Sequence, residues 1–279
     1  MKTVLVPTED HDSMPAVLET AGLIASRFGS YIEGFAVRPA ASNFVAVDPV
    51  SSLTMPTTDE GEAELARAAR SLFESFMQAK GVPPAQPEKA GLSYGWTGAT
   101  AEDDSFVGSH GRLFDLIVLG RPGRGPRDPR MAPLEAALFE AGRLVLVAPP
   151  VAPQEFGRNI LLSWNGSTEQ ARTNAFALPL LREAAQVTVL SVEGGITPGP
   201  SGDEVARFLR MDGVRATAKA IKPAGRSSPG DAILDYAKSH GCDLLVKGAY
   251  TQSRLRQMIF GGVTRDVLAN ATLPVLMAH

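Results

Sequence analysis

Short apolar runs alternate with stretches of helical periodicity along the whole chain. Runs such as Thr3–Asp10 and Phe114–Gly123 pass from apolar residues into polar or glycine-rich turns, as buried strands of a parallel sheet do. Between the strands, Val17 to Phe28 carries apolar residues at helical spacing, with Ser13 before it and Gly29 as a stop. Regular alternation of strands and helices predicts an α/β fold with a doubly wound parallel sheet.

The chain is an internal repeat. Three segments of the first half recur in the same order in the second half, as the pairs Thr3–Asp10 and Asn159–Gly166, Phe114–Gly123 and Cys242–Thr251, and Leu144–Pro149 and Pro274–His279. We therefore expect five strands and four helices in each half, with two domains at residues 1–151 and 152–279. The seam Ala148–Gly157 is proline-rich and reads as an extended linker.

The last strand of each half is strongly apolar, and an exposed apolar edge invites pairing with another strand. We predict that these two strands pair with each other, which would make the chain an internal pseudo-dimer. A further homodimer of whole chains stays open. The first half is longer by the insert Pro39–Thr58, rich in Pro, Ser and Thr, which is either a lid or, as is more common, a solvated loop.

Composition narrows the class of protein. The 279 residues carry a net charge of −3, with 44% apolar and 20% charged residues. There is no basic field to attract nucleic acid or a membrane surface, so neither is expected as a partner. The N-terminal residues lack a signal-peptide pattern, and no apolar run approaches bilayer length, which predicts a cytoplasmic protein. The sole cysteine, Cys242, excludes an internal disulfide and is expected to be an inert buried thiol.

Catalytic and metal motifs are not recognisable in the sequence. The four histidines lack metal-ligand spacing, and His240 fits a helix C-cap better. Loops for phosphoryl acceptance, nucleotide activation or a Gly-x-x-x-x-Gly-Lys phosphate cradle do not occur. Trp96 and Trp164 follow predicted strands where a base could stack, although packing is the commoner role of such residues. We therefore expect that the protein is not an enzyme and has no metal site.

A ligand of such a sheet binds beyond the carboxyl ends of the strands. In the second half, three segments should meet there: the turn Ser163–Ser167, the strand end at Gly248, and the predicted helix start Gly261–Arg265. A helix N-terminus offers free N–H groups to a phosphate, and glycine permits close approach. Thr264 would add a hydroxyl donor, and the charged donors would be arginines, namely Arg254, Arg256 or Arg265.

These segments resemble the universal stress protein family, specifically its tandem two-domain members, over essentially the whole chain. The resemblance implies a loop of Gly, two residues, Gly, nine residues, then Gly and Ser or Thr, together with an Asp after the first strand. Gly248 and Gly261 match this loop, whereas Thr251, Gly262 and Asn165 depart from it. Thr251 adds a branched side chain near the phosphates, Gly262 loses a hydroxyl, and Asn165 keeps hydrogen-bonding capacity.

The first half departs further from the family loop. Gly120 and Gly123 keep the spacing, but Pro133 and Leu134 follow where donors are needed, and Glu9 replaces the Asp. Four arginines recur every three residues in this loop and could form an anion site, although a solvated basic loop is the commoner case: Arg121, Arg124, Arg127 and Arg130. We expect this half not to bind ATP in the family manner.

Two functional interpretations follow from the resemblance. The first is a cytosolic stress protein that binds an adenine nucleotide (ATP, ADP or AMP, with or without Mg²⁺) in its second half as a regulatory ligand. The second is an interaction module without nucleotide that acts through an unknown protein partner. The predicted binding residues are Asn165, Gly166, Gly248, Thr251, Arg256, Gly261, Gly262, Val263 and Thr264.

Overall fold

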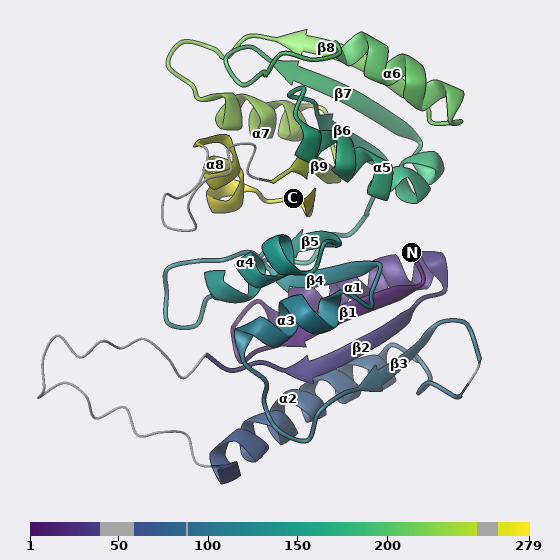
Figure 1. The fold of residues 1–279 in the computed structure, drawn as a ribbon, viewed down its shortest axis with the longest axis vertical. Helices are drawn as coiled ribbons and strands as arrows, with labels where there is room; N and C mark the ends of the chain where they lie inside the picture. Colours follow the sequence, from purple (N-terminus) through teal and green to yellow (C-terminus); the bar gives the residue numbers. More distant parts are fainter. Residues whose placement is uncertain (40–58, 88, 250–261) are drawn as a thin grey trace, which may run out of the picture.

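The ten strands of the described part of the chain form one continuous sheet in the order β3-β2-β1-β4-β5-β10-β9-β6-β7-β8. The computed structural model describes residues 1–39, 59–87, 89–249 and 262–279. The two halves of the chain lie one above the other in Figure 1, and the sheet runs through both of them. The insert Pro39–Thr58 therefore lies almost entirely outside the described residues, and neither interpretation of it is tested.

Each half follows the predicted alternation of strands and helices. The first half consists of β1 (Thr3–Thr8), α1 (Met14–Phe28), β2 (Tyr31–Ala36), α2 (Asp59–Ala79), β3 (Ser93–Trp96), α3 (Asp104–Gly111), β4 (Leu116–Gly120), α4 (Met131–Glu140) and β5 (Leu144–Ala148). The second half consists of β6 (Asn159–Ser163), α5 (Thr168–Glu183), β7 (Gln186–Val192), α6 (Gly202–Met211), β8 (Ala216–Ile221), α7 (Pro229–Ser239), β9 (Leu244–Gly248), α8 (Gly262–Asn270) and β10 (Val275–Ala278). The predicted element order is confirmed.

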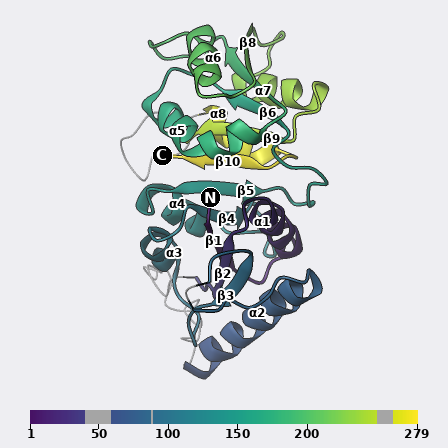
Figure 2. The same ribbon diagram turned by 90° about the vertical axis from the view of Figure 1, so that its right-hand side faces the viewer.

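The last strands of the two halves pair with each other, as predicted. Strand β10 runs antiparallel to β5, with Leu276 opposite Leu146, while the other named strand pairs are parallel. Figure 2 shows β5 and β10 side by side at the middle of the molecule. Both leucine side chains are fully buried, so the pairing hides the two apolar edges from water.

Helices cover both faces of the sheet, and each face has its own apolar core. One core joins side chains of α1, α2, α5 and α6 to the sheet, and the other joins side chains of α3, α4, α7 and α8. Both cores contain residues of both halves. The halves are therefore fused through the sheet and through both packed layers, which predicts that they unfold together.

Capping residues in the sequence mark the ends of several helices. Gly29 ends α1 in the left-handed conformation at φ 58°. Ser228 starts α7 with a complete capping box to Asp231. Ser167 caps α5 by accepting from the Gln170 amide, but the Gln170 side chain bonds to Asn174 and the Gly248 amide, so only half of a capping box forms. Within the described part of the chain, no helix combines the length and apolar character needed to cross a bilayer.

Candidate functional site

A pocket of about 310 Å³ opens at the carboxyl ends of β6, β7 and β9. Its walls come from the ends of these strands, the turns after β6 and β7, and the starts of α7 and α8. The lining residues are Ser163, Trp164, Asn165, Val192, Gly194, Gly195, Ile196, Thr197, Pro229, Ile233, Lys247, Gly262, Val263 and Thr264. This is the crevice in which α/β sheets of this kind bind their ligands.

Four of the residues predicted from the sequence line this pocket together: Asn165, Gly262, Val263 and Thr264. Gly262 is the first residue of α8, and a Cβ placed on it would have no heavy atom within 4 Å among its described surroundings. Among the described residues, nothing crowds the first turn of α8 where it meets the pocket wall. Thr251, Arg256 and Gly261 lie outside the described residues, as does Arg254, while Arg265 is an exposed residue of α8.

Asn165 and Gly166 shape the turn after β6. The main-chain oxygen of Asn165 accepts from both the amide and the hydroxyl of Thr197, at 2.7 and 2.9 Å. Its side-chain oxygen accepts from the Ser167 amide at 3.1 Å. Gly166 has φ 81° and lies so close to the Thr197 carbonyl that a Cβ would stand 2.5 Å from it. These contacts join the turns after β6 and β7 into one rim of the pocket.

Gly248 stands behind the pocket rather than in its lining. Its amide donates to the Gln170 side chain at 2.6 Å, and a Cβ on it would meet the Gln170 main-chain nitrogen at 2.5 Å. Glycine is therefore required here for the close approach of β9 to the first turn of α5. Packing against α5 is thus enough to require glycine here, without any phosphate. The sequence spacing alone could not distinguish packing from phosphate binding as the reason for this glycine.

Lys247 is the functional candidate that the sequence interpretation missed. Its side chain is 5% exposed, and its ammonium donates at 2.9 Å to both the Gly248 carbonyl and the Thr264 hydroxyl. Burial lowers the pKa of Lys247 to about 8, because removal from water penalises the charged form. The sequence did contain a signal for this residue, because a lysine directly precedes the glycine that ends a buried strand. Charged residues are rare inside buried strands.

Other residues singled out in the sequence take structural roles. Trp164 is buried at the pocket wall and its indole N–H donates to the Pro200 carbonyl at 2.7 Å. His240 lies at the end of α7 with Nδ1 3.0 Å from the Tyr236 carbonyl, the expected capping position. Burial raises the pKa of the Cys242 thiol to about 11, which keeps it protonated and unreactive at neutral pH. Trp96 packs against Phe73 in the first half.

The equivalent strand ends of the first half hold a partly buried ion network. Arg130 donates to Glu9 at 2.7 Å and to Asp104 at 2.9 Å, so one guanidinium joins the end of β1 to the start of α3. Burial raises the pKa of Glu9 more than the neighbouring Arg130 lowers it. The side chains of this half thus supply both the cation and the anions at its strand ends.

The glycine loop of the first half binds a carboxylate of its own. Asp128 accepts from the amides of Arg124 and Gly125 at 2.9 and 2.7 Å. A Cβ on Gly123 would stand 2.2 Å from the same carboxylate oxygen, so this glycine makes room for an internal anion. Successive main-chain N–H groups that converge in this way form a small anion-binding nest.

The expectation of a solvated basic loop in the first half is corrected for Arg130 and Arg121. Arg130 is part of the partly buried network. Arg127 is exposed as expected, and it pairs with Asp12 and Asp10 at the surface. The Arg121 guanidinium donates to the Ala269 carbonyl near the end of α8, which links the two halves. Charge patterning could not reveal these partners, because they come from other turns and from the other half.

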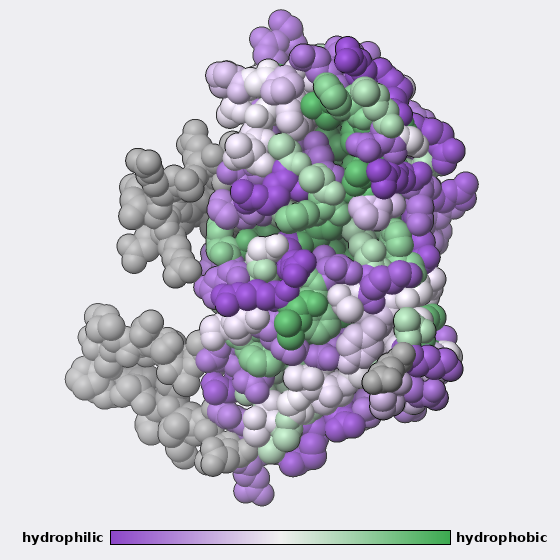
Figure 3. Space-filling view, turned by 45° about the vertical axis from the view of Figure 1, so that its right-hand side comes forward, coloured by the Kyte–Doolittle hydropathy of each residue, from purple (hydrophilic) through white to green (hydrophobic). Residues whose placement is uncertain are grey.

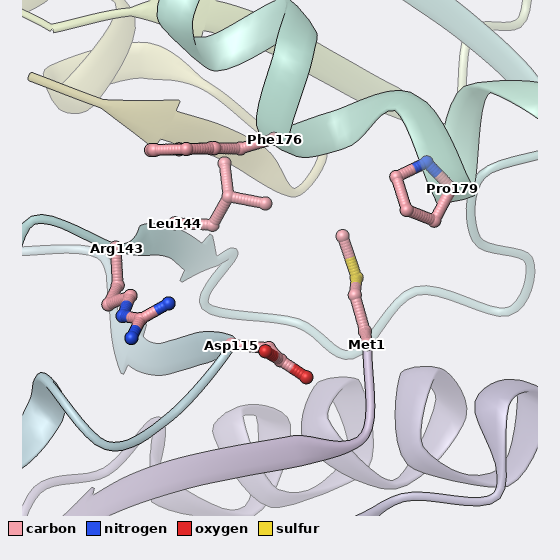
Figure 4. Close-up of a pocket in the computed structure, with 6 residues that line it drawn as sticks. All are labelled: Met1, Asp115, Arg143, Leu144, Phe176 and Pro179. Atoms are coloured by element: carbon pink, nitrogen blue, oxygen red, sulfur yellow. The ribbon is translucent and has the colours of Figure 1, made fainter.

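A second hollow, of about 160 Å³, lies where the two halves meet (Figure 4). It is lined by Met1, Asp115, Arg143, Leu144, Phe176 and Pro179. Its charged groups already have partners: Asp115 accepts from the Lys2 amide, and Arg143 donates to the Arg112 carbonyl. This hollow offers apolar contacts from Met1 and Phe176 but less of the donor chemistry found beside α8.

Comparisons with known proteins agree with the resemblance seen in the sequence. Residues 157–279 match the model of the universal stress protein family. A segment of 49 residues is 35% identical to the stress response protein NhaX of Bacillus subtilis strain 168. That match covers 18% of this chain and 30% of the relative, so it spans less than a third of the relative's length.

Solved structures extend the likeness of fold to the whole chain. A universal stress protein from Archaeoglobus fulgidus DSM 4304 superposes with a TM-score of 0.70 at 13% identity, covering 99% of this chain and 97% of its own. A putative universal stress protein from Pseudomonas aeruginosa UCBPP-PA14 gives a TM-score of 0.56 at 16% identity, covering 100% and 93%. The tandem α/β architecture predicted from the repeat is therefore shared with full-length relatives.

Proposed function

We propose that this chain, whose residues 157–279 match the universal stress protein family model, binds an adenine nucleotide in its second half as a regulatory ligand. The pocket beyond β6, β7 and β9 is the proposed site. The observation that carries the proposal is the open first turn of α8, where Gly262 leaves room for a ligand beside main-chain N–H groups. The predicted residues Thr251, Arg256 and Gly261 remain part of the proposed site.

The two halves have different roles in this proposal, with domains at residues 1–151 and 152–279. The first half serves as a structural partner, because Arg130 and Asp128 already occupy its strand ends and its glycine loop. The second half carries the ligand. The protein acts as a cytoplasmic stress protein and not as an enzyme. The experiment below identifies which nucleotide binds, ATP, ADP or AMP, and whether Mg²⁺ accompanies it. Homodimerisation stays a prediction.

The proposal is tested by ligand identity and by one substitution. Purified protein is heat-denatured, and released small molecules are identified by mass spectrometry; ATP, ADP and AMP are then titrated by calorimetry. Gly262→Val should weaken nucleotide binding by about tenfold or more, because the new side chain fills the space beside the α8 amides. Ala269→Val places the same side chain on an exposed position near the other end of α8 and should leave the affinity unchanged.

Two results would overturn the proposal. One is the lack of measurable binding of all three nucleotides to the wild type, which would favour the interaction module acting through a protein partner. That alternative has one observation in its favour, since the Asn165 side-chain oxygen already accepts from Ser167. The other is unchanged affinity in Gly262→Val, which would remove the site from this pocket.

A further inference from the structure

The pocket of the second half contains one charged side chain among its described lining residues, and that side chain is a buried cation. Lys247 lies at the end of β9, 5% exposed, while the other lining residues are apolar or neutral. Lysine is almost never fully buried unless an opposite charge accompanies it, because an ammonium loses its hydration on burial. The charge of Lys247 therefore calls for an explanation.

No carboxylate of the described residues forms an ion pair with Lys247. Acidic residues do stand on the helices around the pocket, but their hydrogen bonds go to groups other than Lys247. Asp231 of α7 accepts from the Ser228 amide, and Asp266 of α8 accepts from the Ser228 hydroxyl. Glu169 of α5 accepts from the Thr168 hydroxyl. Burial alone accounts for the lowered pKa of Lys247, with no carboxylate to offset it.

The contacts of Lys247 leave hydrogen-bond donors for a further acceptor. Its ammonium has three N–H groups, and two of them go to the Gly248 carbonyl and the Thr264 hydroxyl. Because the Thr264 oxygen accepts from Lys247, its own O–H remains to donate. The same bond of 2.9 Å ties the ammonium to the first turn of α8, whose amides begin at Gly262.

We propose that Lys247 and Thr264 form an anion-binding corner of this pocket, which takes a phosphate group of the ligand. The inference rests on the pocket of the proposed function and adds a charged ligand group to it. A phosphate is the chemistry that fits, because an ammonium, a hydroxyl and helix N-terminal amides all donate. Bound there, it would supply the negative charge that none of the described residues places beside Lys247.

The first half provides an internal contrast. By the repeat, Leu119 stands in the place of Lys247 and Ala136 in the place of Thr264. Both are buried apolar residues, so that half lacks the ammonium and the hydroxyl together. The half whose loop is closed by Asp128 thus has no buried cation at this position, whereas the half with the open α8 turn has one.

The test compares AMP, adenosine and inorganic phosphate as ligands of the full chain. Lys247→Met should weaken AMP binding about 10- to 100-fold and leave adenosine binding unchanged, since only AMP carries the charged group. Lys238→Met, which removes an exposed lysine of α7, serves as the control for net charge and should bind AMP like the wild type. Thr264→Val should weaken AMP binding less than Lys247→Met.

The outcomes separate this inference from the proposed function. If wild type binds AMP and adenosine equally well and Lys247→Met changes neither, the nucleotide site stands and the anion corner is wrong. If wild type binds no nucleotide but inorganic phosphate raises its melting temperature, and Lys247→Met abolishes that rise, the anion corner stands alone. Should Lys247→Met fail to fold, Thr264→Val decides: unchanged AMP affinity in that variant would overturn the inference.

Discussion

The two halves of this chain share a fold and differ in how their strand ends are completed. In the first half, Arg130 joins Glu9 and Asp104, and the Asp128 carboxylate lies in the glycine loop. In the second half, the corresponding crevice is a pocket with a buried cation and an open helix start. Duplication has therefore left one half whose strand ends hold ion pairs between its own side chains, and one half whose strand ends border a pocket with a buried lysine.

The comparison also explains why both halves persist as full α/β units. The first half contributes β5 to the middle of the sheet, and both apolar cores run through both halves. Its loop adds a direct contact, since Arg121 donates to the Ala269 carbonyl of α8. A half without a proposed ligand site thus supports the half that has one. Neither half presents its last strand as a free edge.

Leu276→Asp tests this mutual support and carries the largest expected effect. The new carboxylate would replace a fully buried side chain paired with Leu146, at a cost of about 4 kcal/mol or more. Because each half has one tryptophan, variants retaining only Trp96 or only Trp164 report on the halves separately in urea. Both signals should be lost together at a lower urea concentration. Thr272→Asp, at an exposed position, is the control.

Independent unfolding of the two halves would break the comparison. If Leu276→Asp shifted the Trp164 transition and left the Trp96 transition unchanged, the sheet would not couple the halves. The same conclusion would follow if the Trp96 and Trp164 signals changed at different urea concentrations in the single-tryptophan proteins without Leu276→Asp.

Lys247 gives the second half a pH dependence that the first half, with Leu119 in that place, lacks. Because burial lowers its pKa to about 8, the unfolded chain holds the proton more tightly between about pH 8 and 10.5. The free energy of unfolding should therefore rise with pH across this window, by roughly 3 kcal/mol in total. Urea unfolding of wild type and Lys247→Met from pH 7 to 10.5 measures this contribution as the difference between the two proteins.

The difference between the two proteins is needed because another group opposes the trend. Burial raises the pKa of Cys242 from 9.0 to about 11, so its contribution to stability falls as the pH rises between these two values. Cys242 is present in both proteins and cancels in the comparison. Parallel pH profiles for wild type and Lys247→Met would show that Lys247 is not buried as described.

Arg130→Met probes the ion network that completes the first half. Removal of the guanidinium leaves Glu9 and Asp104 facing each other, and we expect a loss of about 2 kcal/mol at pH 7, moderated by the partial exposure of Arg130. The loss should shrink as the pH is lowered, because burial already raises the pKa of Glu9 and protonation relieves the repulsion.

The matched control is Arg127→Met, three residues earlier in the same loop. Its pairs with Asp12 and Asp10 are exposed, and such pairs contribute little in water. Chemical denaturation should not distinguish this variant from the wild type. If both variants lost the same free energy of unfolding, burial would not be what makes the Arg130 network contribute to stability.

Sequence periodicity was sufficient for the architecture but not for the site. The repeat of Phe114–Gly123 in Cys242–Thr251 located β4 and β9, and apolar ends predicted the pairing of β5 with β10. These features depend on local pattern and on burial of apolar edges, which a sequence displays directly.

The site depends on side-chain partners that are distant in the sequence. The role of Gly248 is set by Gln170, 78 residues earlier, and no loop spacing reveals that contact. Lys247 was read as part of a strand because an apolar run surrounds it, and its significance appears only once Thr264 is placed beside it. The role of Asp128 as an internal anion likewise depends on the loop geometry, which brings its carboxylate to the Arg124 amide.

The proposed difference between the halves amounts to one nucleotide site per chain, in the second half. Calorimetric titration of the full chain with the best-binding adenine nucleotide measures it most directly, with Gly262→Val titrated in parallel. We expect one nucleotide bound per chain and loss of that binding in Gly262→Val. Two equivalents per chain, or one equivalent that survives Gly262→Val, would contradict it.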